Sequence, residues 1–216
     1  ETYPDILKLV TGGKAPDSFN IGGPGLVPMI HAAQMLIDDD AEVRFFGLTG
    51  YDKISAKIFE MLRNFPLDFS HFNPSSEKPT PFTDVFSDPG YDNGHGERTF
   101  VNNIGAAWDF KPENLPGGFF DSDIVCFGGT ALVPHIHDGL TGLLQKAKNA
   151  GCMTVVNTVY DFRSEKNNPG TVWPLGNTRE SFRLNDILVM DREEALKISG
   201  QVSVETAAAW FISQKL

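Results

Sequence analysis

A glycine-rich stretch near the start of the chain could bring a ligand close to the backbone. It reads Gly-Gly-Pro-Gly at residues 22–25 and leads directly into a helical pattern. Gly22 and Gly23 carry no side chain, so a ligand can approach there, and free amides before a helix suit hydroxyl groups or anions. The spacing is neither G-x-G-x-x-G nor G-x-x-x-x-G-K-[ST], which disfavours dinucleotide and P-loop sites. A tight turn without a ligand would use the same residues.

A pair of carboxylates, Asp191-x-x-Glu194, is the second candidate. It follows a predicted strand and opens a predicted helix, so both side chains lie on one helical turn. Two carboxylates placed in this way can hold the hydration shell of a metal ion. Acidic residues in a first helical turn are also favoured by the helix dipole, without any metal. Both interpretations stay open from the residues alone.

The remaining reactive side chains match no common catalytic or zinc-binding spacing. His135 and His137 are two residues apart, which points their side chains to different faces of a helix, and no Cys/His cluster has zinc spacing. The chain has no G-x-S-x-G nucleophile elbow. Its two cysteines, Cys126 and Cys152, lie in apolar, strand-like surroundings, so we expect buried, reduced thiols.

The elements that must position these residues alternate between helix and strand. A helix is predicted after the glycine loop from the spacing of Ile30, Ala33 and Ile37, and a buried strand follows at residues 43–48. A turn then leads into a second helix, with apolar residues on one face: Ile54, Ile58, Met61 and Leu62. This order is typical of a parallel sheet covered by helices.

The middle of the chain departs from this order. Residues 81–86 and 97–101 are strand candidates separated by a stretch rich in Gly, Asp, Asn and Pro, which favours a β-hairpin. Residues 6–10 also have the pattern of an extended segment. Alternation then returns with strands and helices at these positions: strands 123–127, 153–157 and 186–190, helices 136–150, 191–200 and 204–216, and a long loop 158–185.

The composition is acidic and excludes some classes of protein. The chain has 216 residues, enough for one large domain, with 28 acidic and 18 basic residues and a formal net charge of −10. This balance argues against nonspecific nucleic-acid binding and against docking on an anionic membrane. A bilayer span requires about 18 consecutive apolar residues, and no apolar run in the sequence approaches this length. Since no leader is recognisable at the N-terminus, we expect a cytoplasmic protein.

Taken in order, the motifs resemble the ribokinase/PfkB family of carbohydrate kinases. The glycine loop, the helix after it and residues 43–50 resemble the family's N-terminal signature. Residues 47–52 (Gly-Leu-Thr-Gly-Tyr-Asp) resemble its G-x-x-G-x-D turn, and residues 97–106 resemble its G-E-R hairpin with a G-A ending. Asp191-Arg192-Glu193-Glu194 stands where the family has N-x-x-E. The matches keep the family's order over nearly the whole chain.

The resemblance implies an α/β fold: a three-layer α/β/α ribokinase-like domain with a small β-sheet lid. The lid segments would lie at about residues 5–20 and 80–104 of an incomplete domain that spans residues 1–216. The resemblance also implies transfer of the γ-phosphate of ATP to a hydroxyl of a small sugar substrate, with Mg2+ bridging the phosphates. The lid would close over the sugar and exclude water.

The resemblance also implies roles for individual residues. Gly22 and Gly23 would line the sugar site through their backbone, and Asn103 would approach the same pocket from the lid. Glu194 would organise magnesium-bound water near the nucleotide phosphates. Asp191, in place of the family's Asn, would orient water or metal beside it while adding a negative charge.

Several family residues have no counterpart. Val27 stands in place of a signature Asn and cannot hydrogen-bond a sugar, residues 155–157 do not clearly match the D-x-N-x-R run, and the first family strand, with its sugar-binding Asp, is missing. The G-A-G-D motif, which carries the general base and the anion hole, is absent. Because the chain begins without Met and stops within a helical pattern, we expect a fragment of a longer kinase that is inactive by itself.

Two other functions stay open. A non-catalytic, kinase-like module could bind a sugar or a partner protein, which Val27 and Asp191 favour slightly. A different α/β enzyme, such as a sugar-phosphate isomerase or a nucleotide-binding hydrolase, would have no lid, and its hairpin would join the main sheet. A homodimer through the lid is expected if apolar hairpin residues form one exposed face: Phe82, Phe86, Phe100 and Val101.

Overall fold

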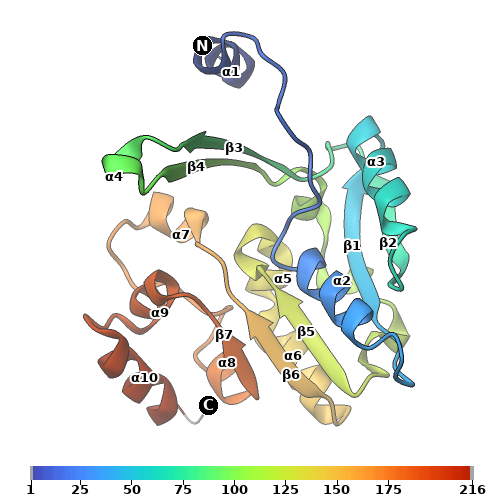
Figure 1. Ribbon diagram of the computed structural model, residues 1–216. Coiled ribbons are helices and arrows are strands. Elements are labelled where there is room, and N and C mark those ends of the chain that lie inside the picture. Colours follow the sequence, from blue (N-terminus) through green and yellow to red (C-terminus); the bar gives the residue numbers. More distant parts are fainter. Residues whose placement is uncertain (1, 215–216) are drawn as a thin grey trace.

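Parallel strands and helices alternate in both halves of the molecule, and a hairpin connects the halves (Figure 1). The computed structural model describes residues 2–214. It confirms an α/β fold with parallel sheets. Among these residues, no helix combines the length and the apolar character needed to cross a membrane.

The N-terminal half is built on two parallel strands. β1 (Arg44–Gly50) pairs with β2 (Asp68–Ser76), and the helices α2 (Leu26–Met35) and α3 (Lys53–Leu62) precede and connect them. Their apolar residues form one core cluster: Leu26, Ile30, Ala33, Leu62, Leu67 and Phe72. β2 was not expected from the sequence, because its polar residues and Pro74 obscure the strand pattern.

The C-terminal half holds a three-stranded parallel sheet in the order β5-β6-β7. Its strands are β5 (Ile124–Gly128), β6 (Met153–Asn157) and β7 (Ile187–Val189). The core on one face includes Leu140, Leu143, Leu144, Val156 and Trp173. The helices of this half are α5 (Pro134–Asp138), α6 (Leu140–Asn149), α7 (Phe162–Asn167), α8 (Glu180–Arg183), α9 (Arg192–Ser199) and α10 (Val204–Ser213).

Two helix predictions and one loop prediction in this half need correction. The helix expected at 136–150 is two helices, α5 and α6, which meet at Gly139. The loop expected at 158–185 contains the short helices α7 and α8. The helix expected at 204–216 ends at Ser213 in α10, and residues 215–216 lie outside the described residues.

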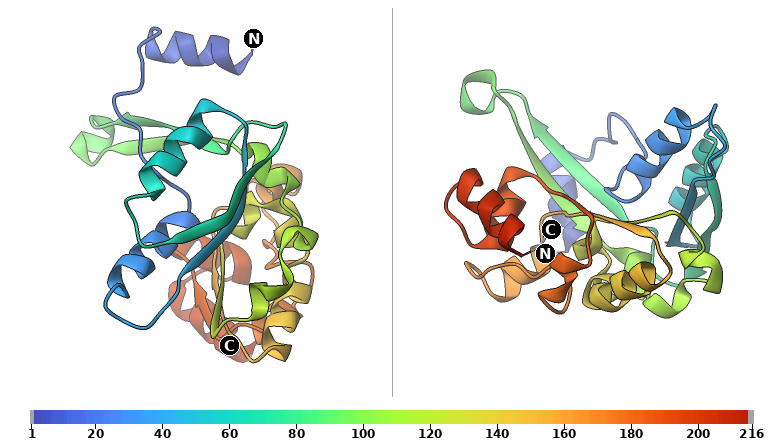
Figure 2. Two further views of the ribbon diagram at one scale, coloured as in Figure 1. Left: turned by 90° about the vertical axis from the view of Figure 1, so that its right-hand side faces the viewer. Right: turned by 90° about the horizontal axis from the view of Figure 1, so that it is seen from below.

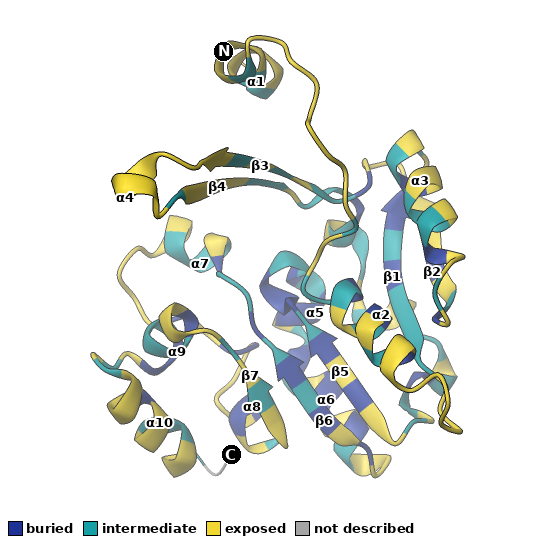
Figure 3. Ribbon diagram, viewed as in Figure 1, coloured by how far each residue is buried: buried dark blue, intermediate teal, exposed yellow. Residues whose placement is uncertain are grey.

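The second face of this sheet is open. Side chains alternate along β5 and β6, so Val125, Phe127 and Val156 are buried on the helical side (Figure 3). On the other side apolar residues are exposed: Ile124, Met153, Ile187 and Val189. Cys126 is exposed there too, so the prediction of two buried thiols is wrong for Cys126 and confirmed for Cys152. Parallel sheets are normally covered on both faces, which makes this apolar face unusual.

The hairpin is confirmed as a separate antiparallel sheet. β3 (Phe82–Asp88) pairs with β4 (Glu97–Asn103), and the short helix α4 (Tyr91–Gly94) lies at the tip. The register places Val85 opposite Phe100 on one face, whereas Phe86 lies one residue further along and points to the other. The four residues 82, 86, 100 and 101 therefore do not share one face, because the side-chain period of a strand is two.

The N-terminal segment is a helix and not the extended segment expected at residues 6–10. Helix α1 (Tyr3–Thr11) begins where the Asp5 carboxylate accepts a hydrogen bond from the Thr2 backbone N at 2.9 Å, and it ends at Gly12 with a φ of 62°. Such capping at both ends stabilises a short helix. Residues 12–25 connect α1 to the rest of the molecule (Figure 2). Its Tyr3 hydroxyl donates to Asp84 of β3 at 2.5 Å.

The described residues also include short 3-10 helices. These are η1 (Gly105–Asp109), η2 (Pro112–Asn114), η3 (Gly117–Phe120) and η4 (Thr130–Leu132).

Candidate functional site

The glycine loop lies against the end of β5. Gly25 directly precedes α2, and a Cβ added to Gly128 would lie 2.6 Å from the Gly25 Cα. Glycines on both sides thus allow two backbone segments to touch. A Cβ at Gly22 or Gly23 would meet nothing within 4 Å, and both residues are exposed. The predicted ligand-facing glycines are therefore accessible at the carboxyl edge of the sheet.

Hydrogen bonds join the ends of the three parallel strands into one continuous edge. The Gly129 N donates to the Asn157 O at 2.8 Å, which links the end of β5 to that of β6. The Thr158 N donates to the Val189 O at 2.9 Å, which links β6 to β7. In open α/β sheets, ligands bind outside this carboxyl edge.

The carboxylate pair lies at the β7 end of the same edge. Asp191 caps α9, and its carboxylate accepts a hydrogen bond from the Glu194 N at 2.8 Å. The Glu194 carboxylate accepts from the Asp191 N at 3.2 Å and from the Thr158 hydroxyl at 2.6 Å. Glu194 is buried, with 8% of its surface exposed. The capping interpretation of this pair is therefore correct, and it orients Glu194 along the strand edge.

Thr158 was missed by the sequence reasoning. Its hydroxyl fixes one oxygen of Glu194 across 36 residues of sequence. The signal available in the sequence was its position directly after a predicted strand, where side chains of α/β proteins face ligands. Nothing local to Thr158 identifies Glu194 as its partner.

The residues present fit a magnesium ion that is held mainly by other ligands. Within residues 2–214 no three or more His, Cys, Asp or Glu side chains gather as a metal site. In the hydrogen bonds above, Glu194 uses only Oε2. Mg2+ keeps several waters and is commonly bound through one or two carboxylates together with substrate phosphates. Glu194 could hold such an ion through water, whereas a cage made of protein ligands alone does not fit.

The hairpin lies beyond the carboxyl ends of β5 and β6 (Figure 1). Asp52, the last residue of the G-x-x-G-x-D match, holds its base. The Asp52 carboxylate accepts hydrogen bonds from the Thr80 N at 2.7 Å and from the Thr80 hydroxyl at 2.8 Å. Burial alone would raise the pKa of Asp52, but the hydrogen bonds from Ser55 and Thr80 hold it below its usual value.

Asn103 is the site residue that the structure does not bring to the others. It ends β4 opposite Phe82 and is exposed. The register places it on the hairpin face of Asp84, which Tyr3 contacts. No hydrogen bond in the described part of the chain joins Asn103 to the glycine loop or to Glu194. The structure thus places the glycine loop at the β5 end and Glu194 at the β7 end of one strand edge, and the roles of Gly22, Gly23, Glu194 and Asn103 stay predictions.

Several solved structures with the same fold are named as sugar or nucleoside kinases. A ribokinase from Giardia lamblia superposes with a TM-score of 0.67 at 17% identity over 94% of this chain and 59% of that chain. An Arabidopsis thaliana ribokinase complexed with ribose and ATP gives 0.62 at 17% identity over 86% and 55%. An Anopheles gambiae adenosine kinase in complex with a di(adenosine) tetraphosphate gives 0.67 at 20% identity over 91% and 54%.

These comparisons confirm the ribokinase-like α/β fold. No protein-family model matches the sequence, and no curated protein matches it. The chain spans less than two thirds of the length of each of these structures. The separate β3-β4 sheet also contradicts the alternative of an α/β enzyme whose hairpin joins the main sheet.

Proposed function

We propose that the complete protein is an ATP-dependent carbohydrate kinase of the ribokinase/PfkB type. One observation carries the proposal: the glycine loop and Glu194 lie at two ends of one carboxyl strand edge, in a fold shared with solved ribokinases. The acceptor would be a hydroxyl of a small sugar or sugar-like molecule. The structures that were solved with ribose and ATP, or with fructose and ADP, support this substrate class.

In this proposal residues 1–216 position the sugar and the nucleotide and do not supply the general base. The open backbone at Gly22 and Gly23 binds sugar hydroxyls, and Asn103 reaches the sugar when the hairpin closes. Glu194, oriented by Thr158, holds the water shell of Mg2+ beside the nucleotide phosphates, with Asp191 fixing the helix start. Mg2+ neutralises charge on the phosphates when bound. Positioning and electrostatics supply most of the catalysis in phosphoryl transfer.

The general base would come from further polypeptide. Residues 1–216 contain no Gly-Ala-Gly-Asp sequence, and the solved kinases have much additional chain. The open apolar face of β5, β6 and β7 offers a surface for such a segment to pack on. Residues 1–216 alone would then bind ligands without transferring phosphate. A cytoplasmic location, with ATP and reduced thiols, belongs to the same proposal.

The test is phosphoryl transfer by the complete protein. The purified protein is incubated with ATP, Mg2+ and a panel of sugars and nucleosides, and the sugar phosphate is identified by mass spectrometry. We expect one sugar class to be phosphorylated, and no product from residues 1–216. Rapid phosphorylation by residues 1–216 would refute the proposed source of the base. No product from the complete protein with any acceptor would refute the kinase.

A non-catalytic module is the second candidate, favoured by the absent base and by Val27 in place of a hydrogen-bonding residue. It predicts sugar binding whose affinity does not depend on nucleotide. Calorimetry with and without ATP separates the two functions.

A homodimer through the hairpin is a further part of the proposal. Its exposed face is that of Val85 and Phe100, which are 50% and 47% exposed.

A further inference from the structure

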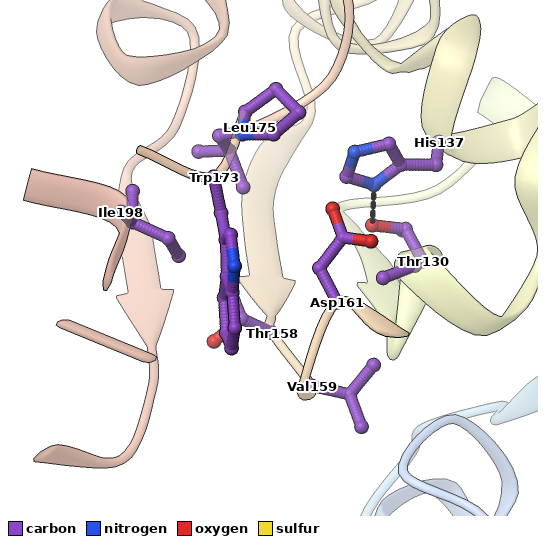
Figure 4. A pocket seen from close by; sticks show the side chains of 10 residues that line it. Thr130, His137, Thr158, Val159, Asp161, Trp173, Leu175 and Ile198 are labelled. Carbon is purple, nitrogen blue, oxygen red and sulfur yellow. Dashed lines mark hydrogen bonds between the residues drawn. The ribbon is translucent and has the colours of Figure 1, made fainter. Parts of the chain in front are cut away.

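A small cavity lies beside the carboxyl ends of β5 and β6 (Figure 4). Its volume is about 10 Å³, and Thr130, His137, Thr158 and Asp161 give it a polar wall. Trp173, Leu175 and Ile198 close the other side with apolar surface. A cavity of this size has room for one water molecule and for no larger ligand.

Two buried side chains at this cavity have an atom without a hydrogen-bond partner. His137 and Asp161 are each only 3% exposed. The Nδ1 of His137 is 3.0 Å from the Thr130 hydroxyl, but its Nε2 has no partner among the described residues. Asp161 caps α7 by accepting from the Ser164 N at 2.9 Å through Oδ1, while Oδ2 has none. Buried polar atoms nearly always find a partner in protein or ordered water.

The two side chains face one another. In Figure 4 the Asp161 carboxyl group lies beside the imidazole of His137. No direct hydrogen bond or ion pair joins them within the described residues. A water molecule needs two to four polar partners to be held in a cavity. The His137 Nε2, the Asp161 Oδ2 and the Thr130 hydroxyl supply such a set.

We propose that this cavity binds one water molecule that joins His137 to Asp161, and that His137 stays neutral there in mild acid, whereas the unfolded chain takes up a proton at this histidine. The bridge connects α5, which carries His137, to the segment after β6, which carries Asp161. Because that segment also carries Thr158, the site lies next to the residue that orients Glu194. The inference does not depend on kinase activity.

Burial is the main reason why His137 stays neutral in the folded protein, and charged groups surround it. Asp161 and Arg163 face it from the segment after β6, and Asp138 faces it from α5, where Arg163 donates a hydrogen bond to Asp138 at 3.0 Å. Burial lowers the pKa of His137, although the charges of Asp161 and Asp138 partly oppose this. The unfolded chain, with an ordinary histidine pKa of about 6.5, therefore binds the proton more readily than the folded one.

Mild acid should therefore destabilise the folded protein. Below about pH 6.5 the unfolded state gains a proton that the folded state takes up only at lower pH, so stability falls as the solution becomes more acidic. For one proton, the unfolding equilibrium constant rises by up to about tenfold per pH unit.

The test compares urea unfolding of the purified full chain between pH 5 and pH 8. We expect the wild-type unfolding constant to rise as the pH falls, and His137→Gln to remove up to about tenfold per pH unit of that rise. His31→Gln, at an exposed position of α2, is the matched control and should leave the profile unchanged. If His137→Gln left the pH dependence of the unfolding constant unchanged, the proposed role of His137 would be wrong.

A second measurement does not depend on how the variants fold. The NMR titration of His137 in the folded wild-type protein should have its midpoint below about pH 6.5. A midpoint above that value would contradict a neutral His137 in mild acid. A nuclear Overhauser contact between His137 and a long-lived water should be present. Its absence, or a direct His137–Asp161 hydrogen bond in a high-resolution crystal structure, would overturn the bridging water.

Discussion

The carboxylate of Asp52 holds Thr80 by two hydrogen bonds across 28 residues of sequence. Asp52 caps α3 at the carboxyl end of β1, and Thr80 is buried just before β3. The Thr80 hydroxyl oxygen also accepts a hydrogen bond from the Gly50 N at 3.1 Å. One carboxylate therefore fixes the base of the hairpin to the N-terminal half.

Replacing Asp52 should loosen that anchor. Asp52→Ala removes a helix cap and leaves the buried Thr80 groups without their acceptor, which should cost about 1–3 kcal/mol of unfolding free energy. Urea unfolding measures the loss, and hydrogen exchange should increase at residues 80–104. Asp17→Ala, at an exposed loop position, is the control. Equal stability of the two variants would contradict the anchoring role.

The same carboxylate should make the protein sensitive to strong acid. Its pKa is lowered in the folded state, so its stabilising effect is present above the usual value of about 3.9 and is lost as the pH falls through the lower folded value. Unfolding at several pH values between 5 and 2 should show a smaller acid-induced loss in Asp52→Asn than in the wild type. An identical loss in both proteins would argue against this assignment.

The contact between the glycine loop and β5 can be tested with alanine. A Cβ at Gly128 would lie 2.6 Å from the Gly25 Cα and 2.8 Å from the Pro24 O, so Gly128→Ala must displace the loop. We expect a loss of about 1–3 kcal/mol and weaker sugar binding. Gly142→Ala is the matched control, because its Cβ meets nothing within 4 Å on α6, and it should stabilise by about 0.5–1 kcal/mol. Equal sugar affinity of Gly128→Ala and Gly142→Ala would show that the glycine loop does not bind the sugar.

The open sheet face can be tested through its cysteine. Cys126 is exposed on the same face of β5 as Ile124, whereas Cys152 is buried. In residues 1–216 a thiol reagent should label Cys126 and leave Cys152 unlabelled until the protein unfolds. Because burial by its neighbours raises the pKa of the Cys126 thiol, the reaction is run at mildly alkaline pH. In the complete protein, Cys126 should be protected. Labelling at the same rate in both would refute a covering segment.

Local signals were sufficient wherever a short stretch specifies its own geometry. The glycines at 22–25, the turn-rich segment between β3 and β4, and the Asp191–Glu194 capping pair each required only neighbours in sequence. Residues 6–10 show the limit of this reasoning. Their apolar run suits a strand or a helix, and the Asp5 cap with Gly12 decides for the helix.

The remaining features depend on partners far apart in the chain. Thr158 meets Glu194, and Thr80 meets Asp52, through folding of the whole sheet edge. Burial of a strand residue likewise depends on what covers its face, so Cys126 has a strand-like context and is still exposed. Pairing across the sheet decides these contacts, and a single sequence carries no local signal of them.

The hydrogen bond from Thr158 predicts a graded effect on nucleotide use. Thr158→Val keeps the shape but removes the donor to Glu194, so the carboxylate should lose its orientation. In the complete protein we expect KM for magnesium–ATP to rise by about tenfold, the lower end of the range for residues that orient metal ligands. Thr158→Ser, which keeps the hydroxyl, should restore most of the loss. No difference between Val and Ser would show that Thr158 does not orient Glu194.

The most direct test of the proposed kinase site is the magnesium dependence of Glu194→Gln in the complete protein. Glu194 accepts the Thr158 hydrogen bond at the strand edge, whereas Glu193, one residue earlier on α9, is exposed. Phosphoryl transfer is measured over a range of Mg2+ concentrations for both glutamine variants. We expect that Glu194→Gln needs about 10–100 times more Mg2+ or loses activity by that factor, while Glu193→Gln matches the wild type. Equal magnesium dependence in both variants would contradict the proposed kinase site.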